Sequence, residues 1–257
     1  MGPHVTWFEI LLPGYGHLQD FGRHYLARDW TWQMFQSTYF SIDHVLGALL
    51  VAAFLIFGAA RYTAAVGRAG DAGLIPPPTF GLRNLFESLT DMVLGLMESV
   101  MGEKEARRYL PLVGTLFLFI LFSNLMALIP GFLPPTDTLK TNLGLALLVF
   151  LLTHAFGVRA HGIGYFKHFL GPWLPLAPLM LPIEIISHIA RPVSLSMRLL
   201  GNISADHAVV LAFFAVVPFL LPVPFLVMGI FVSVVQAVVF SLLTTVYISN
   251  AVAHEQH

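Results

Sequence analysis

Five stretches of this chain are long and apolar enough to cross a lipid bilayer as helices. A helix needs about 20 mostly apolar residues to span a hydrocarbon core of about 30 Å. The composition agrees, because 57% of the residues are hydrophobic and 11% are charged, against about 25% charged in soluble domains. The sequence therefore predicts an all-α polytopic membrane protein, with residues 1–257 forming a single membrane domain. The predicted segments are 43–64, 109–132, 139–158, 173–217 and 222–251.

The last two segments are longer than an upright membrane helix. At about 1.5 Å per residue, residues 173–217 would extend about 65 Å, roughly twice the membrane thickness. This segment is therefore either strongly tilted or broken near Pro192 into two upright pieces. We favour one bent, steeply tilted helix, because a turn beside Arg191 would add unsatisfied backbone groups to an already polar spot. A turn near 218–224 then closes a long, strongly tilted helical hairpin.

The remaining parts are an N-terminal segment and one long connection. Residues 1–42 lack a basic start followed by a short apolar core, so they do not resemble a signal peptide, and we expect them on the outer side. Residues 65–108 are expected to form a cytoplasmic loop. Within this loop, 80–101 has the period of an amphipathic helix lying along the cytoplasmic membrane surface, with a helix packed beneath the spans as the alternative. The apolar side of this helix holds Leu82, Leu85, Phe86, Leu89, Met92, Val93 and Leu96, and Arg83, Glu87, Asp91 and Glu98 lie elsewhere.

The basic residues predict the orientation in the membrane. Cytoplasmic loops of membrane proteins carry an excess of lysine and arginine. If the N-terminus is outside, eight basic residues flank the spans on the cytoplasmic side and three on the outer side, so we expect an outer N-terminus and a cytoplasmic C-terminus. The eight are Arg61, Arg68, Arg83, Lys104, Arg107, Arg108, Arg159 and Lys167, and the three are Arg23, Arg28 and Lys140.

Composition and motifs exclude several classes of function. The chain has no cysteine, so disulfides, thiolate metal sites and cysteine nucleophiles are excluded. A formal charge of -1 and the lack of a basic cluster argue against binding to nucleic acid. The sequence contains no glycine-rich phosphate loop, no His-Glu-x-x-His pattern and no Gly-x-Ser-x-Gly elbow. We therefore expect no cofactor and no catalytic site of these kinds.

Polar residues form a stripe along the fourth apolar segment. Their spacings are combinations of three and four, which would place them in one band of a helix. Arg198 dominates this band, because arginine keeps its proton and a charge at bilayer depth costs about 2.5–3.5 kcal/mol on insertion scales. In the last segment, Gln236 could hydrogen-bond the guanidinium or a neighbouring amide, with Ser233 and Thr244 near one face and Tyr247 beyond. The stripe comprises Glu184, Ser187, His188, Arg191, Ser194, Arg198, Asn202 and Asp206.

Simpler interpretations apply to most of these polar residues. Asn202, Ser194 and Gln236 are each compatible with hydrogen bonding that only joins two helices. Glu184 could pair with Arg191, although seven residues is an awkward separation for a direct ion pair.

Two further residues stand apart from these interpretations. His207 is equally compatible with a place near the outer interface. Arg198 has no acid at the adjacent helical positions, so its counter-charge is expected from another segment or another protein.

The run RPVSLSMRLLGN at 191–202 resembles a signature of one family. With Glu184 fourteen residues before Arg198, and with Gln236 in the final segment, it is similar to the a subunit of F-type ATP synthases, the stator of a rotary proton channel. Further matches are NLMALIP at 124–130, PTDTLKTN at 135–142 and TTVYIS at 244–249. The resemblance covers nearly everything from the first span onward.

This resemblance implies a non-catalytic subunit that couples proton flow to rotation and ATP synthesis. The family's essential arginine corresponds to Arg198, which would face a ring of c subunits that each carry a membrane carboxylate. The implied partners are the c ring, b-type peripheral stalk subunits, the remaining ATP synthase subunits and the lipid bilayer. The implied location is the bacterial cytoplasmic (inner) membrane, with the proton as the preferred coupling ion.

The resemblance also implies two offset half-channels. Ser194 and Gln236 are also predicted to take part in proton translocation, together with Arg198 and the residues of the two half-channels. A departure from the family occurs at Asp206 and His207, where glycine and glutamate respectively are common, and either residue could still exchange protons. The inner half-channel is expected to contain Glu184, His188, Arg191 and Ser187, and the outer one Asn202, Asp206 and His207.

Two other functions fit the sequence less well. A stand-alone secondary ion transporter would usually show repeated halves with interrupted helices, and five unequal segments without internal symmetry argue against it. The second is an intramembrane hydrolase that uses histidines and acids, and the sequence lacks the motifs of such an enzyme, as described above.

Overall fold

The protein is entirely helical in the regular structure of its described residues, which confirms the predicted fold class. The computed structural model describes residues 6–25, 42–69, 81–129, 131–162, 164–165, 177–216 and 222–253, without some side chains inside these ranges. Its helices are α1 (Trp7–Leu11), α2 (Tyr15–Tyr25), α3 (Asp43–Ala69), α4 (Leu82–Met101), α5 (Glu103–Met126), η3 (Pro135–Asp137), α6 (Leu139–His161), α7 (Ala177–Val216) and α8 (Pro222–Val252).

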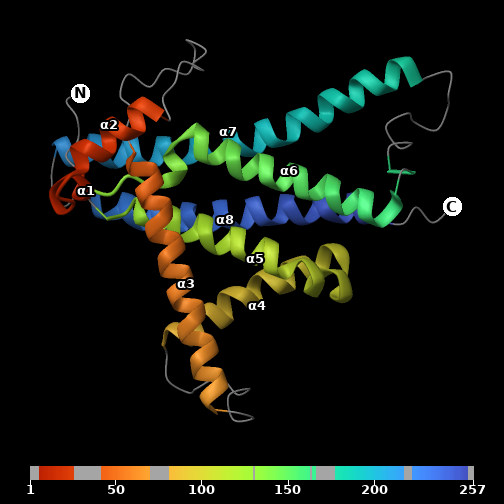
Figure 1. Cartoon of the computed structure of the whole chain (residues 1–257), viewed down its shortest axis with the longest axis horizontal. Helices are drawn as coiled ribbons and strands as arrows, with labels where there is room; N and C mark the ends of the chain where they lie inside the picture. The colour runs from red at the N-terminus through yellow and green to blue at the C-terminus, as the bar shows by residue number, and fades with distance from the viewer. Residues whose placement is uncertain are drawn as a thin grey trace.

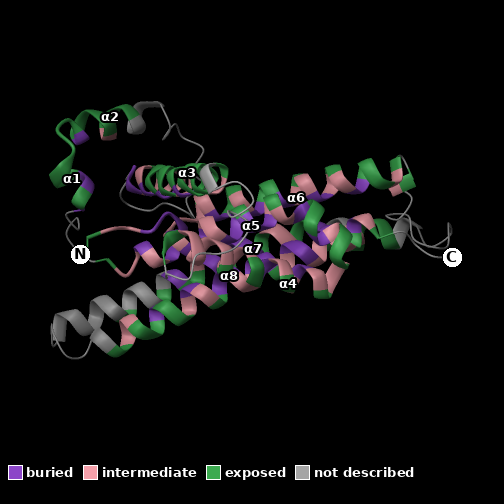
Figure 2. Ribbon diagram, turned by 90° about the horizontal axis from the view of Figure 1, so that it is seen from below, coloured by how far each residue is buried: buried purple, intermediate pink, exposed green. Residues whose placement is uncertain are grey.

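Four long helices form the body of the molecule. α5, α6, α7 and α8 run alongside one another, and α3 crosses this bundle at a steep angle (Figure 1). Buried residues are concentrated along the centre of the bundle, whereas α3 is largely exposed (Figure 2). The largest fully buried side chains of this core include Phe117 of α5, Leu199 of α7 and Phe240 of α8. The α7–α8 hairpin therefore contributes directly to the core.

Four of the described helices are long and apolar enough to cross a membrane. They are Asp43–Gly67, Glu103–Met126, Leu139–His161 and Pro224–Val252. Their exposed apolar surfaces agree with this, because α3 alone exposes Leu49, Ile56 and Phe57. The chain is thus a polytopic membrane protein. The position of α7 as a fifth membrane segment stays a prediction.

The predicted amphipathic helix is α4, and it joins α5 through a single residue. Gly102 has a φ of 79°, a conformation that favours glycine, and α5 begins at the next residue. The second span therefore begins at Glu103 rather than at residue 109, and it ends at Met126 rather than at residue 132. Val93 and Met97 of α4 are 1% exposed and belong to the bundle core. α4 consequently packs against the spans along much of its length.

The helix α7 does not break at its prolines. It runs unbroken for 40 residues through Pro182 and Pro192. A membrane helix can absorb the hydrogen bond that proline removes as a local kink. The preference for one long helix over two upright pieces is therefore confirmed.

The N-terminal segment is attached to the bundle through Asp43, the first residue of α3. Asp43 is 4% exposed, and its Oδ1 accepts hydrogen bonds from the Tyr15 hydroxyl at 2.9 Å and the Thr6 hydroxyl at 3.3 Å. The Trp7 backbone N–H also donates to the carbonyl of Gly131 at 3.1 Å. Residues 6–21 thus pack on the start of α3 and on the α5–α6 connection.

A buried polar cluster holds α5, η3 and α6 together. The Thr136 hydroxyl donates to Asn124 Oδ1 at 2.8 Å, and Asn142 Nδ2 donates to the Thr136 carbonyl at 2.7 Å. All three residues are fully buried. Because buried polar groups need partners, this cluster explains why NLMALIP and PTDTLKTN carry amides and hydroxyls at these positions.

Replacing Asn142 with alanine is expected to destabilise the fold by about 1–3 kcal/mol, because the Thr136 carbonyl would lose its donor in a dry environment. Thermal unfolding of the detergent-solubilised protein would show a lower midpoint temperature. Leu143→Ala is the control, since Leu143 lies on the same helix and is exposed. Equal midpoints for both variants would contradict a stabilising role of the cluster.

Candidate functional site

Helix packing divides the polar stripe of α7 between two faces. Leu195, Leu199 and Ile203, spaced four residues apart, are 3%, 0% and 3% exposed and form the buried face. His188 lies on this same face and is buried, whereas Ser194 and Arg198 are exposed. Ser187 and Asn202 are also exposed, and Glu184 and Arg191 are half-buried. Because α7 is one unbroken helix, the spacing still places these residues in one band, but the core covers only part of that band.

Arg198 lies on the exposed side of α7. Val193 and Met197, in the same stretch of the helix, are 44% and 45% exposed and make much of this surface apolar. Within the described ranges, Arg198 makes no hydrogen bond and no ion pair. An apolar surface of this kind is covered by lipid or by another protein, so the guanidinium is placed where a second polypeptide could reach it.

The two long helices are joined by a pair of amides. Asn202 Nδ2 of α7 donates to Gln236 Oε1 of α8 at 2.7 Å, and Gln236 is 4% exposed. Gln236 therefore bonds a neighbouring amide, one of the two partners expected for it. The hydroxyls of Ser233 and Thr244 are also buried, but they donate to carbonyls of their own helix, Gly229 at 2.7 Å and Phe240 at 2.8 Å.

A second polar group lies near the start of α7. Glu184 Oε1 is 3.4 Å from His188 Nδ1, and the same nitrogen is 3.1 Å from the Glu184 carbonyl. The Arg191 guanidinium lies over the Tyr247 ring of α8, 5.5 Å from its centre. The alternative in which Glu184 pairs with Arg191 was wrong, because residues four apart on a helix meet more readily than residues seven apart.

Sequence reasoning missed two members of this second group, His154 and Tyr165. The His154 ring of α6 is 5.2 Å from the His188 ring and 5.8 Å from the Tyr165 ring, measured between centres. Gly157 makes room for this arrangement, because a Cβ there would clash with the Tyr165 ring. Burial raises the pKa of the Tyr165 hydroxyl, against the opposing charge of Arg191, so the hydroxyl stays protonated at neutral pH.

A sequence signal for His154 did exist. It is an ionisable residue inside the predicted span 139–158, and such residues are functional candidates by default. Among the described residues, no three metal-binding side chains come together as a metal site.

The side chains of Asp206 and His207 lie outside the described part of the chain, although both residues belong to α7. Their assignment to the outer half-channel stays a prediction.

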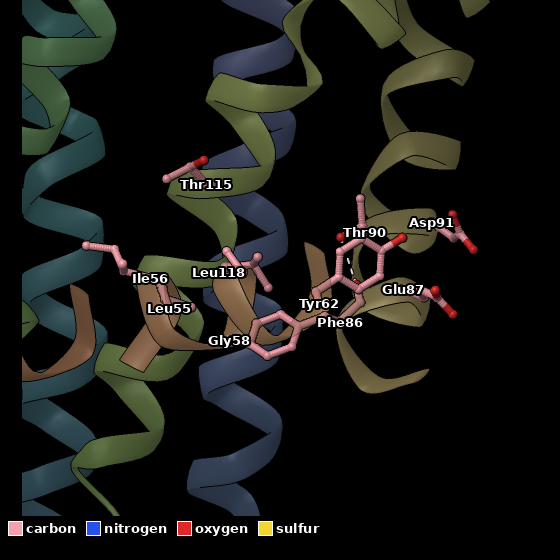
Figure 3. A pocket seen from close by; sticks show the side chains of 11 residues that line it. Leu55, Ile56, Gly58, Tyr62, Phe86, Glu87, Thr90, Asp91, Thr115 and Leu118 are labelled. Atoms are coloured by element: carbon pink, nitrogen blue, oxygen red, sulfur yellow. Dashed lines mark hydrogen bonds between the residues drawn. The ribbon is translucent and has the colours of Figure 1, made fainter. Parts of the chain in front are cut away.

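A cleft lies away from the α7 stripe. It has a volume of about 460 Å³ between α3, α4 and α5, and it is lined by apolar side chains such as Leu55, Phe86 and Leu118, together with Tyr62 and Glu87 (Figure 3). None of the predicted site residues lines it. The cleft therefore does not identify the functional site.

The fold and site define a class of protein: a multi-pass helical membrane protein with polar residues along its longest hairpin. The ATP synthase A chain family matches residues 44–249. ATP synthase subunit a 1 of Syntrophotalea carbinolica is 56% identical over 171 residues, which cover 66% of this chain and 73% of the relative. ATP synthase subunit a of Bdellovibrio bacteriovorus is 46% identical over 211 residues, which cover 82% and 90%. The chain belongs to the ATP synthase A chain family.

Proposed function

We propose that this chain is the non-catalytic stator subunit of an F-type ATP synthase, in which Arg198 faces the rotating c ring. The observation that carries the proposal is the exposure of Arg198 on an apolar face, without an ion pair in the described part of its own chain. A cation at bilayer depth is costly unless a counter-charge meets it. A carboxylate on a neighbouring membrane helix would meet that need.

The chemistry follows from two properties of arginine. A fixed cation favours the ionised form of a nearby carboxyl group, so a protonated c-subunit carboxyl that reaches Arg198 must release its proton. Arginine itself cannot relay that proton, because it does not deprotonate in proteins. Protons would then cross only by riding the ring, and the two half-channels stay separate.

The half-channels occupy the two ends of the hairpin. The hydrogen-bonded pair Asn202 and Gln236 belongs to the outer path, together with Asp206 and His207. Glu184, His188 and Arg191 belong to the inner path. Ser194 lies between the two groups, one helical turn from Arg198. Each proton that crosses about 100 mV supplies about 2.3 kcal/mol for rotation.

The lengths of α7 and α8 support a steep tilt in the membrane. The 40 residues of α7 extend about 60 Å and the 31 residues of α8 about 47 Å, against a hydrocarbon core of about 30 Å. If α7 stays within the core, its axis is about 60° from the membrane normal. In Figure 1, α3 runs at a steep angle to the direction of α7 and α8, which fits an upright α3 and a tilted hairpin. The N-terminus is then outside and the C-terminus in the cytoplasm of a bacterial inner membrane, where b-type stalk subunits complete the stator.

Cysteine cross-linking tests the predicted c-ring surface. The chain has no native cysteine, so single cysteines can be introduced at Val193 or Met197 and paired with one in the carboxylate-bearing helix of the c subunit. Oxidation of assembled membranes should give a–c products from both positions, detected by immunoblotting. Leu199→Cys is the control, since Leu199 is 0% exposed and lies on the opposite, buried face. The proposal fails if Met197→Cys gives no more product than Leu199→Cys.

A further inference from the structure

His154 of α6 is held in a defined state beside the polar group of α7. Its Nδ1 lies 2.8 Å from the carbonyl oxygen of Phe150. A carbonyl oxygen only accepts, so Nδ1 carries the hydrogen of the neutral ring, and Nε2 is the nitrogen that can gain or lose a proton. His188 is anchored in the same way to the Glu184 carbonyl at 3.1 Å. Two imidazoles from different helices thus lie 5.2 Å apart, each fixed by its own backbone.

A small cavity adjoins His154 between α6, α7 and α8. Its volume is about 10 Å³, which is close to the room that one water molecule needs. Thr153, His154, Arg191 and Tyr247 contribute its polar lining. Thr153 is 5% exposed, and its Oγ1 is buried without a hydrogen-bond partner in the described part of the chain. Because buried hydroxyls are nearly always hydrogen-bonded, this one marks a site for a water molecule.

We propose that His154, with a water molecule bound against Thr153, carries protons between the solvent at the inner end of the bundle and the His188–Glu184 pair. This inference rests on the proposed function and adds an α6 residue to an inner path that otherwise belongs to α7. His154 accepts a proton at Nε2, becomes an imidazolium, and releases the proton from the same nitrogen, while Nδ1–H stays bonded to Phe150. The proton is neither produced nor consumed in this transfer.

Other titratable or charged side chains lie around His154. Tyr165 faces it from the turn after α6, His188 and Arg191 from α7, and Tyr247 from α8. Glu184 pairs with His188 behind them.

The test uses the intact ATP synthase in inverted membrane vesicles, whose medium is the inner side. We expect His154→Gln to lower the rate of ATP-driven proton pumping by about 10-fold, since a missing proton-transfer group commonly costs this much or more. Without the imidazole, uptake depends on solvent protons, so the rate should fall more steeply as the pH of the medium rises. Added imidazole should restore part of the rate.

Thr153 provides a matched pair of variants. Thr153→Val removes the hydroxyl at nearly constant volume and should slow pumping about 3-fold, as expected for the loss of one hydrogen bond of under 1 kcal/mol. Thr153→Ser keeps the hydroxyl and should match the parent. If His154→Gln does not assemble, the Thr153 pair decides the question. Equal rates for Val and Ser, or a His154→Gln enzyme with the parent's pH profile and no response to imidazole, would overturn the inference.

Arg198→Ala is assayed in the same vesicles to separate the two proposals. If it pumps normally, the proposed function itself fails. If it is inactive while the His154 and Thr153 variants behave as the parent, only the relay is wrong.

Discussion

Arg198→Ala is expected to abolish ATP-driven proton pumping, with a loss of at least about 100-fold, because an interaction of about 3 kcal/mol between the guanidinium and a carboxylate disappears. Acidification of inverted vesicles would be followed with a pH-sensitive dye. Passive proton leak should rise at the same time, because the fixed charge that separates the two half-channels is gone.

Two further variants serve as controls for this result. Met197→Ala changes the adjacent exposed residue and should pump nearly as the parent does. Arg198→Lys keeps the charge but loses the planar fork of donors, so it should remain strongly impaired. Normal coupling in Arg198→Ala would refute the rotary mechanism.

The amide pair of Asn202 and Gln236 should behave as one functional unit. Gln236→Leu removes the acceptor of the Asn202 amide, and the loss of this hydrogen bond costs about 1.5 kcal/mol, so we expect pumping to fall about 10-fold. Asn202→Leu should have a similar effect. The double variant should be little worse than either single one, because both remove the same hydrogen bond.

Pumping rates of the parent, the two single variants and the double variant complete this cycle. Ser233→Ala is the control on α8, since its hydroxyl bonds only its own helix. A double variant with the product of the two losses, about 100-fold, would show that the residues act independently.

Hydropathy predicted the long helices well, because a membrane span is defined by its length and apolarity alone. The limits of α5 could not be obtained in this way. Its first turn, with Glu103 and Glu105, is charged, and it is helical because Gly102 turns the chain sharply and the acids lie at a helix N-terminus, where the dipole favours them.

Helical periodicity was a weaker guide to the site. It gives the angle of a side chain around its own helix but not which neighbouring helix covers it. His188 and Ser187 are adjacent in sequence, yet the first is buried and the second exposed, because α7 packs on only one side at this point. The contact between His154 and His188 joins residues 34 positions apart on separate helices, and no spacing within either segment predicts it.

The one-residue turn at Gly102 has a mechanical consequence in the proposed motor. A rotor that pushes past α7 exerts a sideways force on the subunit. α4 leaves α5 at a fixed bend and anchors Val93 and Met97 in the same core as α8, so it acts as a strut lying at an angle to the load. A longer, more flexible connection at this bend would let the hairpin move under this force, and part of the work of each rotational step would be lost in that movement.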